Sequence, residues 1–295
     1  MISREELQAR IVSLPTLPMA AAQLATLLRD ERASAADFER IIRPDPALTA
    51  NLLRMANSSF FGMRQEVTSV RRAISLLGTE RIFEIAMGVG FQSVVPERIA
   101  GYEIDSAQFW LHSVAVAVLG ERIAAELGLG CPDLTFTAGL LHDLGKLAIG
   151  SLLEGRETAI RTRISEGCDF ASLERELLGV DHAEAGALVA EAWSLPAALI
   201  HPIAHHHEPS SCPEPSAQRI VDLVHVSDGL AYALGFGSDI GELARRIQPS
   251  VIERLGLRVQ ALEAVACEAM GAIRVMGTMR GEPDGAGSEA DGGWG

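Results

Sequence analysis

The stretch that most constrains this chain runs from Gly139 to Lys146 and reads GLLHDLGK. It places an imidazole and a carboxylate, His142 and Asp143, side by side within an apolar helical pattern. A buried polar group without a partner costs about 1 to 3 kcal/mol, and an unpaired charge costs more. A divalent cation would satisfy both side chains, because imidazole nitrogen and carboxylate oxygen are ligands of first-row metals. The alternative is a helix C-terminus at which Asp143 pairs with Lys146 and Gly145 caps the turn.

Composition narrows the classes of protein that need to be considered. The 295 residues are 48% hydrophobic and 22% charged, which is typical of a soluble chain with one large domain or two modest ones. A net charge of −14 would repel nucleic acid and anionic membrane surfaces. The four cysteines form no C-x-x-C pair, which favours reduced thiols. Because no signal segment or membrane-spanning apolar run is found, we expect a cytoplasmic protein without nucleic-acid or membrane partners.

The first ninety-odd residues show only helical patterns. Ser34 is expected to cap one helix, and Asp45 followed by Pro46 opens the next. A further helix follows Ser69 and ends at Gly78. This region contains no histidine, so we expect a packing unit without chemistry of its own.

All eight histidines lie between residues 112 and 225, which places any histidine chemistry in the second half of the chain. His112 lies near the start of an expected helix. His182 follows Asp181, a residue that suits the N-cap of another helix. Asp228 falls within an otherwise apolar helix that begins near Ala217. Polar side chains on apolar helices indicate a buried polar site.

Each of these residues has an ordinary alternative. A lone histidine is more often a hydrogen-bonded structural residue, which is our interpretation of His201 and His225. The triplet from His205 to His207 could be solvated at a helix end, where imidazolium favours the helix dipole, and Asp228 could hold neighbouring backbone. Several semi-buried polar groups are costly, however, against a net stability of about 5 to 15 kcal/mol. One metal cluster with ligands from separate helices would satisfy them jointly.

Seven blocks of sequence, in a fixed order, resemble the HDOD proteins, which are relatives of the HD and HD-GYP metal phosphohydrolases. The resemblance extends from about Leu14 to Gly235, and the blocks are LPTLP, IIRPDPALTANLLRMANSSFFG, VTSVRRAISLLG, FWLHSVAVA, TAGLLHDLGKLAIG, LLGVDHAEAGALVAEAWSLP and HHHEP. The resemblance implies an all-α, two-lobed fold, with an N-terminal helical lobe at residues 1–97 and an HD-like metal-binding helical lobe at 98–275. Residues 276–295 are rich in glycine and acidic residues, so we expect a disordered tail.

Carried over residue by residue, the resemblance implies a metal site. The ligand positions fall on His112, His142, Asp143, His182, His206, His207 and Asp228. Such nitrogen-rich ligation favours iron or manganese over magnesium, in a mononuclear or dinuclear site. In active relatives a carboxylate such as Asp143 bridges two metals and a bound water attacks phosphorus, while Lys146 would contact a phosphate oxygen. Asp143 and Lys146 are therefore the candidate catalytic residues. Which two of His205, His206 and His207 are ligands stays open, because neighbours on a helix point about 100° apart.

Two functions remain as hypotheses. The family implies a regulatory or output module of bacterial signal transduction, which acts on signalling proteins in trans and has room for a nucleotide or phosphate ligand. The alternative is a metal-dependent phosphohydrolase that acts on a nucleotide or signalling phosphate. Two departures favour the module: no GYP segment follows HHHE, and Gln108 stands four residues before His112, where some HD-GYP enzymes have a metal-binding glutamate. Because the sequence shows no receiver, kinase or cyclase segment, we expect the input to come from another chain or from the residues before Leu14.

Overall fold

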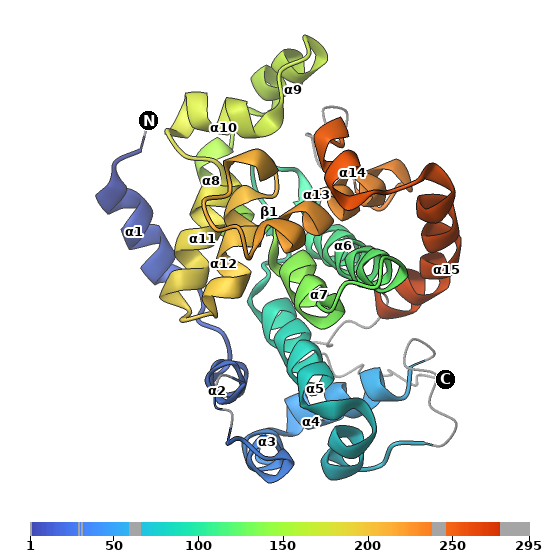
Figure 1. Cartoon of the computed structure of the whole chain (residues 1–295). Helices are drawn as coiled ribbons and strands as arrows, with labels where there is room; N and C mark the ends of the chain where they lie inside the picture. The colour runs from blue at the N-terminus through green and yellow to red at the C-terminus, as the bar shows by residue number, and fades with distance from the viewer. Residues whose placement is uncertain (1, 29, 31, 59–65, 238–245, 278–295) are drawn as a thin grey trace, which may run out of the picture.

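The chain is built almost entirely of helices (Figure 1). The computed structural model describes residues 2–28, 30, 32–58, 66–237 and 246–277, so most of the tail expected at 276–295 lies outside the described residues. The elements, in chain order, are α1 (Arg4–Ser13), α2 (Met19–Leu27), α3 (Ala35–Ile42), α4 (Pro46–Ala56), α5 (Val70–Val94), β1 (Arg98–Ile99), β2 (Ile104–Asp105), α6 (Ser106–Glu126), α7 (Pro132–Leu141), α8 (Gly145–Leu153), α9 (Glu157–Ser165), α10 (Phe170–Leu178), α11 (His182–Ala192), α12 (Ala197–His205), the 3-10 turn η1 (Pro209–Ser211), α13 (Gln218–Ala233), α14 (Pro249–Leu255) and α15 (Val259–Gly277). The expected all-α fold is confirmed, and the small antiparallel hairpin of β1 and β2 is the part it did not include.

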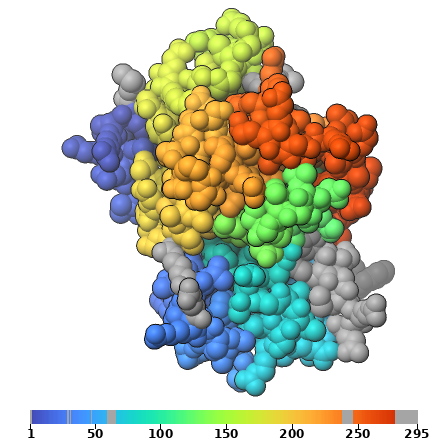
Figure 2. All heavy atoms as spheres, in the orientation of Figure 1, coloured from blue at the N-terminus to red at the C-terminus, as the bar shows by residue number. Residues whose placement is uncertain are grey.

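Helices α2 to α5 form the lower lobe in Figure 1, and the same residues appear blue to cyan in the space-filling view of Figure 2. Their starts follow the predicted caps. Asp45 accepts a hydrogen bond from the Leu48 N–H at 2.9 Å, and Pro46 is the first residue of α4. At α3, Asp37 accepts from the Ser34 N–H at 3.0 Å. Local capping chemistry therefore fixes where these helices begin.

Helix α5 carries the chain from this lobe into the second one. Gly78 interrupts it with a φ of +83°, at the point where the sequence predicts a helix end. An added Cβ at Gly78 would meet nothing within 4 Å, so the left-handed backbone rather than crowding requires glycine there. Beyond this kink, Gly88 lies against Leu140 of α7 and Trp110 of α6.

Helix α6 is the centre of the second lobe, where it packs against α7, α13 and α15 (Figure 1). Its residues from Val114 to Leu119 are all fully buried, as expected for a helix that is apolar on every side. A Cβ on Gly139 would lie 3.0 Å from the backbone of Ala117, so α7 approaches α6 closely. This pairing brings His112 on α6 near the end of α7. None of the described helices combines the length and the apolar character needed to cross a membrane.

The first helix, α1, lies against α8 and α11 of the second lobe (Figure 1). The Ile2 N–H donates to the Leu178 carbonyl at 2.7 Å, and Arg10 donates to the Ser151 hydroxyl at 2.8 Å. Residues near the N-terminus thus contact the HD-like lobe, while the division of the chain at residue 97 stays a prediction.

A partly buried cluster of Arg81 and three carboxyl groups joins α5 to α6 and α7. Arg81 on α5 pairs with Glu84 on the same helix at 2.8 Å, with Glu121 on α6, and with Asp133 on α7 at 3.4 Å. Glu84 is only 2% exposed. Burial raises the pKa of its carboxyl to about 9, although the Arg81 guanidinium acts in the opposite direction.

Candidate metal centre

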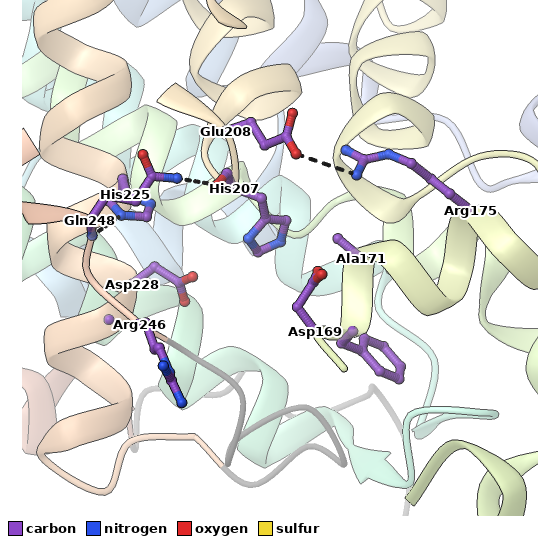
Figure 3. Close-up of a pocket in the computed structure, with 11 residues that line it drawn as sticks. Asp169, Ala171, Arg175, His207, Glu208, His225, Asp228, Arg246 and Gln248 are labelled. Atoms are coloured by element: carbon purple, nitrogen blue, oxygen red, sulfur yellow. Dashed lines mark hydrogen bonds and ion pairs between the residues drawn. The ribbon is translucent and has the colours of Figure 1, made fainter. Parts of the chain in front are cut away.

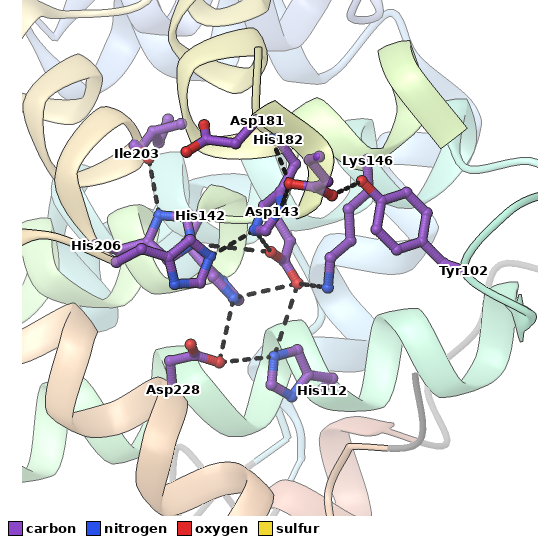
Figure 4. A network of polar contacts seen from close by, with 12 residues as sticks. Tyr102, His112, His142, Asp143, Lys146, Asp181, His182, Ile203, His206 and Asp228 are labelled. Atoms are coloured by element: carbon purple, nitrogen blue, oxygen red, sulfur yellow. Dashed lines mark hydrogen bonds and ion pairs between the residues drawn. The ribbon is translucent and has the colours of Figure 1, made fainter. Parts of the chain in front are cut away.

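The seven predicted ligand residues meet at one place inside the second lobe. Figure 4 labels all of them except His207. They come from separate helices and are His112 on α6, His142 and Asp143 in the turn between α7 and α8, His182 at the start of α11, His206 and His207 after α12, and Asp228 on α13. Apart from His207, which is half-buried, each is 4% exposed or less. The sequence hypothesis therefore has the spatial convergence that it needs.

The turn between α7 and α8 depends on Gly145. A Cβ on this residue would lie 1.9 Å from the His182 carbonyl oxygen and 2.4 Å from the Gly186 nitrogen. Only glycine allows the start of α8 to touch the start of α11 so closely. Gly145 therefore brings the His142–Asp143 pair next to His182, rather than capping the turn as in the alternative drawn from the sequence.

Backbone carbonyls hold three of the histidines by their Nδ1 atoms. His112 donates to the Phe236 carbonyl at 2.9 Å, and His142 donates to the Gly139 carbonyl at 2.7 Å. His206 donates to the carbonyl of Ile203, three residues earlier on α12, at 2.8 Å. Because a carbonyl only accepts, each Nδ1 carries the proton. Each Nε2 is left with a lone pair that faces the centre, as metal ligation requires.

Asp143 lies between two groups of histidines. Its Oδ2 is 3.3 Å from the His142 Nε2 and 3.8 Å from the His112 Nε2. Its Oδ1 is 3.3 Å from the His182 Nε2 and 3.9 Å from the His206 Nε2. The two carboxylate oxygens thus point to different sets of nitrogen atoms (Figure 4).

The described part of the chain contains three sets of possible metal ligands, and within each set the ligand atoms lie within 4.8 Å of one another. The sets are His112, His142 and Asp228; His142, Asp143 and His206; and His182, His206 and His207. Asp228 Oδ1 is 3.2 Å from the His112 Nε2, and the Nε2 atoms of His182 and His207 are 2.6 Å apart. Donor atoms at such spacing suit cations placed between them.

Several of these atoms lack a hydrogen-bond partner although they are buried. They are the Nε2 atoms of His112, His142 and His206 and the Oδ1 atom of Asp143. Each such atom costs about 1 to 3 kcal/mol unless something pairs with it. All four are acceptors once the Nδ1 protons are placed, so a cation is the partner that suits them together. The residues present therefore fit a metal ion.

Burial and neighbouring charges shift the pKa values of Asp143, His182 and His206 in different directions. Burial opposes the charge of Asp143, but His142 and the Lys146 ammonium hold the pKa of its carboxyl well below its usual range. Burial lowers the pKa of His206 far below its usual value, which keeps this imidazole neutral. Burial also disfavours a charged His182, yet the Glu174 carboxylate, followed by Asp143, raises its pKa to about 9. A cation at the His182 Nε2 would take the place of that proton.

Lys146, the second candidate catalytic residue, is 1% exposed and donates to Asp143 Oδ2 at 2.6 Å. Its Nζ lies 5.3 Å from the centre of the Tyr102 ring. The ion pair named in the alternative reading of this stretch is therefore present, and it exists together with the imidazole cluster. The contact supports the charge on Asp143, while a catalytic role of Lys146 stays a prediction.

The three histidines at the end of α12 differ in what they contact. His206 and His207 turn inward, whereas His205 bonds to the Ser211 hydroxyl at 3.0 Å and its ring stacks with His201. His225 is buried but is outside the ligand sets: it donates from Nδ1 to the His206 carbonyl at 2.7 Å. It also accepts at Nε2 from the Gln248 N–H at 3.0 Å. The contacts of His225 agree with its interpretation as a structural residue, while that of His201 stays a prediction.

Glu174 is a residue of the site that the sequence did not predict, whereas Gln108 was singled out in the sequence and proves to cap a helix. Glu174 on α10 is 1% exposed and accepts from the His182 Nδ1 at 2.6 Å, so it belongs to the site although no local pattern marks it. Gln108 accepts from the Asp105 N–H at 3.2 Å and completes the capping box of α6. At this position the chain therefore has a residue of the helix cap.

A cavity of about 290 Å³ opens beside the centre (Figure 3). His207 and Asp228 form part of its wall, together with Arg175 from α10 and Arg246 and Gln248 from the segment before α14. Arg175 pairs with Glu208 at 3.8 Å across one edge of it. The cavity gives a small molecule of that size access to two of the predicted ligands.

Among curated proteins, the chain resembles an uncharacterized protein of Treponema pallidum, with 25% identity over 211 residues that cover 70% of this chain and 40% of that protein. It is also similar to ribonuclease Y of Thermus thermophilus, with 31% identity over 168 residues, 56% of this chain and 24% of that enzyme. The chain thus spans less than half the length of these relatives.

Two crystal structures share the fold. A protein of Shewanella amazonensis, described as a candidate phosphohydrolase, superposes with a TM-score of 0.72 at 26% identity and covers 93% of this chain and 97% of its own. An HDOD domain protein of unknown function from Geobacter sulfurreducens gives 0.70 at 24% identity, with 94% and 97% covered. The sequence profile of the HDOD domain matches residues 14–209. This match covers well over half of the sequence, and the chain belongs to the HDOD domain family.

Proposed function

We propose that this protein is a regulatory module of bacterial signal transduction whose second lobe binds two metal ions and which acts through partner proteins. The observation that carries the metal proposal is the place of Asp143. Its Oδ2 lies toward His112 and His142, and its Oδ1 lies toward His182 and His206. A carboxylate that offers one oxygen to each side suits a pair of cations.

The two proposed ion positions have different ligands. The His112 position consists of His112, His142, Asp228 and Oδ2 of Asp143. The His182 position consists of His182, His206, His207 and Oδ1 of Asp143. Both mix imidazole nitrogen with carboxylate oxygen, which favours iron or manganese over magnesium. Divalent ions bound there would supply Lewis-acid chemistry toward a phosphoryl oxygen.

The regulatory part of the proposal rests on family membership and on where the centre lies. Its ligands tie together α6, α7, α11, α12 and α13, which form the body of the second lobe. Because metal binding contributes directly to the stability of the fold that supplies the ligands, ions would hold these helices in one arrangement. An output surface built on the lobe would then depend on the state of the centre.

Elemental analysis of the purified protein tests the metal proposal. We expect about two first-row ions per chain, and we expect Asp143→Ala to lose both because this side chain is shared. The matched control is Asp222→Asn: Asp222 is also a buried carboxylate on α13, but it pairs with Arg254 at 2.6 Å, away from the centre. Wild-type protein without metal, or an Asp143 variant with full metal, would contradict the proposal.

A second candidate function is metal-dependent phosphohydrolysis, and the cavity of about 290 Å³ favours it. The cavity reaches His207 and Asp228, so a phosphate-bearing ligand could extend from its wall to the centre. Lys146 would keep Asp143 ionised during such a reaction, since it holds Oδ2 at 2.6 Å. The Shewanella relative described as a candidate phosphohydrolase adds support.

Hydrolysis of phosphoesters, followed by the release of p-nitrophenol or of the nucleotide product, decides between the two candidates. The metal-loaded protein is assayed with bis(p-nitrophenyl) phosphate and with mononucleotide, cyclic and dinucleotide substrates. Bound metal without turnover supports the regulatory module. Turnover that Asp143→Ala abolishes and Asp222→Asn preserves would establish the hydrolase instead.

A further inference from the structure

Glu174 is a buried carboxylate that contacts one of the predicted metal ligands, His182. It is 1% exposed and lies on α10, outside the seven predicted ligands. Its Oε2 accepts from the His182 Nδ1 at 2.6 Å and from the His182 backbone N–H at 2.9 Å. Its Oε1 accepts from the Tyr102 hydroxyl, and Tyr102 is fully buried in the loop between β1 and β2. Both oxygens are therefore held in place.

The partner of its Nδ1 distinguishes His182 from three other histidines of the centre. His112, His142 and His206 each donate from Nδ1 to a neutral backbone carbonyl. The acceptor of His182 is an ionisable side chain. A carboxylate at Nδ1 fixes the plane and tautomer of the ring and strengthens Nε2 as an electron donor more than a carbonyl does.

Lys146 adds to the difference between the two sides. Its ammonium holds Asp143 Oδ2 at 2.6 Å, so on the His112 side a resident cation already shares this oxygen. On the His182 side, Asp143 Oδ1 has no hydrogen-bond partner among the described residues. The His182 side thus combines a carboxylate oxygen that Lys146 does not hold with an imidazole that a carboxylate supports.

We propose that Glu174 is a positioning residue that sets the affinity of the His182 position and leaves the His112 position unchanged. The inference rests on the two-ion centre proposed above. Glu174 orients His182 from behind the ring, and Tyr102 orients Glu174. The two ions therefore bind with unequal affinity, and the Tyr102 hydroxyl is linked through Glu174 to the His182 position.

Glu174→Gln separates charge from shape. Glutamine has the same length, and its amide oxygen can still accept from the His182 Nδ1 while the Tyr102 hydroxyl turns to accept from the amide nitrogen. The substitution thus keeps the hydrogen bonds and removes the negative charge. Replacement of such outer partners typically costs 10 to 100-fold in metal affinity, so we expect a loss of about tenfold. Tyr102→Phe leaves the bond to His182 intact and should weaken the same position less.

The experiment is a Co²⁺ titration of the full chain against a competing chelator, with the number of ions and each affinity fitted. Glu174→Gln is measured alone, with His112→Ala, and with His182→Ala, and thermal melts confirm folding. In the otherwise wild-type chain, we expect Glu174→Gln to weaken the binding of one of the two ions. Together with His112→Ala, it should weaken the binding of the single ion that remains. It should have no effect with His182→Ala. Asp222→Asn, a buried carboxylate in an ion pair with Arg254, should change neither affinity.

Three outcomes overturn the inference. The first is that Glu174→Gln weakens the binding of both ions equally. The second is that Glu174→Gln has the same effect in the His182→Ala variant as in wild type. The third is that neither Glu174→Gln nor Tyr102→Phe changes the affinity of either ion. A wild-type chain that binds one ion refutes the two-ion centre itself. In that case the inference stands only if Glu174→Gln weakens this ion while His182 is present and not after His182→Ala.

Discussion

Gly145→Ala should damage both the fold and the centre, and the structure gives the size of the effect. The new Cβ would lie 1.9 Å from the His182 carbonyl oxygen and 2.4 Å from the Gly186 nitrogen. Carbon atoms do not approach backbone oxygen closer than about 3 Å, so α8 and α11 must separate by roughly 1 Å in a tightly packed interior. Both obstacles are backbone atoms, which no change of rotamer removes.

Overpacking of a core costs about 1 to 3 kcal/mol, and we expect the upper end because backbone has to move. The shift also displaces His182 from Asp143, so ion binding at the His182 position should weaken at least about tenfold. Gly271→Ala is the matched control. Gly271 is exposed on α15 with nothing within 4 Å of an added Cβ, and alanine there should stabilise the helix by about 0.5 to 1 kcal/mol.

Urea unfolding in EDTA, followed by circular dichroism, measures the fold without the contribution of metal. The Gly145→Ala midpoint should fall and the Gly271→Ala midpoint should rise, with unchanged slopes. Metal titration of the same two proteins then measures the centre. A Gly145→Ala protein that unfolds at the wild-type midpoint and binds metal normally would refute the close approach of α8 and α11.

Three further predictions follow from the other contacts. Glu84 keeps its proton in the folded chain up to a pKa of about 9 but loses it near 4.5 when unfolded, so its contribution to stability falls as pH rises between these values. Glu84→Gln should therefore gain stability relative to wild type from pH 5 to pH 8, and a pH-independent difference in melting would contradict this. EDTA should lower the melting temperature of metal-loaded wild type. If the free ion had been 100-fold above its Kd, the corresponding loss in the free energy of unfolding is about 2.7 kcal/mol, and the melting temperature of Asp143→Ala should not change. His225→Leu removes the bonds to the His206 carbonyl and the Gln248 N–H and should cost about 1 to 3 kcal/mol; His225→Asn can still donate to His206 and should recover part of that loss in urea unfolding.

Local chemistry explains why so many helix starts could be predicted. Asp45, Asp181 and Ser69 each accept the backbone hydrogen bond expected of an N-cap, and Gly78 has the positive φ expected at a helix break. These signals act over three or four residues and need no tertiary context. The two-residue strands of the hairpin carry no such pattern, which is why the sequence did not predict them.

The candidate site was predictable in its residue types and not in its supporting contacts. His142 and Asp143 stand out because a polar pair within an apolar pattern demands a partner. Glu174 does not stand out, since it shares the segment LERELL with Glu176, which is exposed and pairs with Arg163 at 3.0 Å. Which of these two glutamates is buried depends on how α10 packs against the rest of the lobe. That information lies in contacts between residues far apart in the chain.

Electron paramagnetic resonance of the Mn²⁺-loaded protein tests the central claim most directly. If Asp143 offers one oxygen to each of two ions, wild type should bind two Mn²⁺ per chain and give the spectrum of an exchange-coupled pair. Asp143→Asn should lose the coupling, while Asp222→Asn should keep it. A six-line spectrum of an isolated Mn²⁺ ion in wild type, or no bound Mn²⁺ at all, would contradict the account.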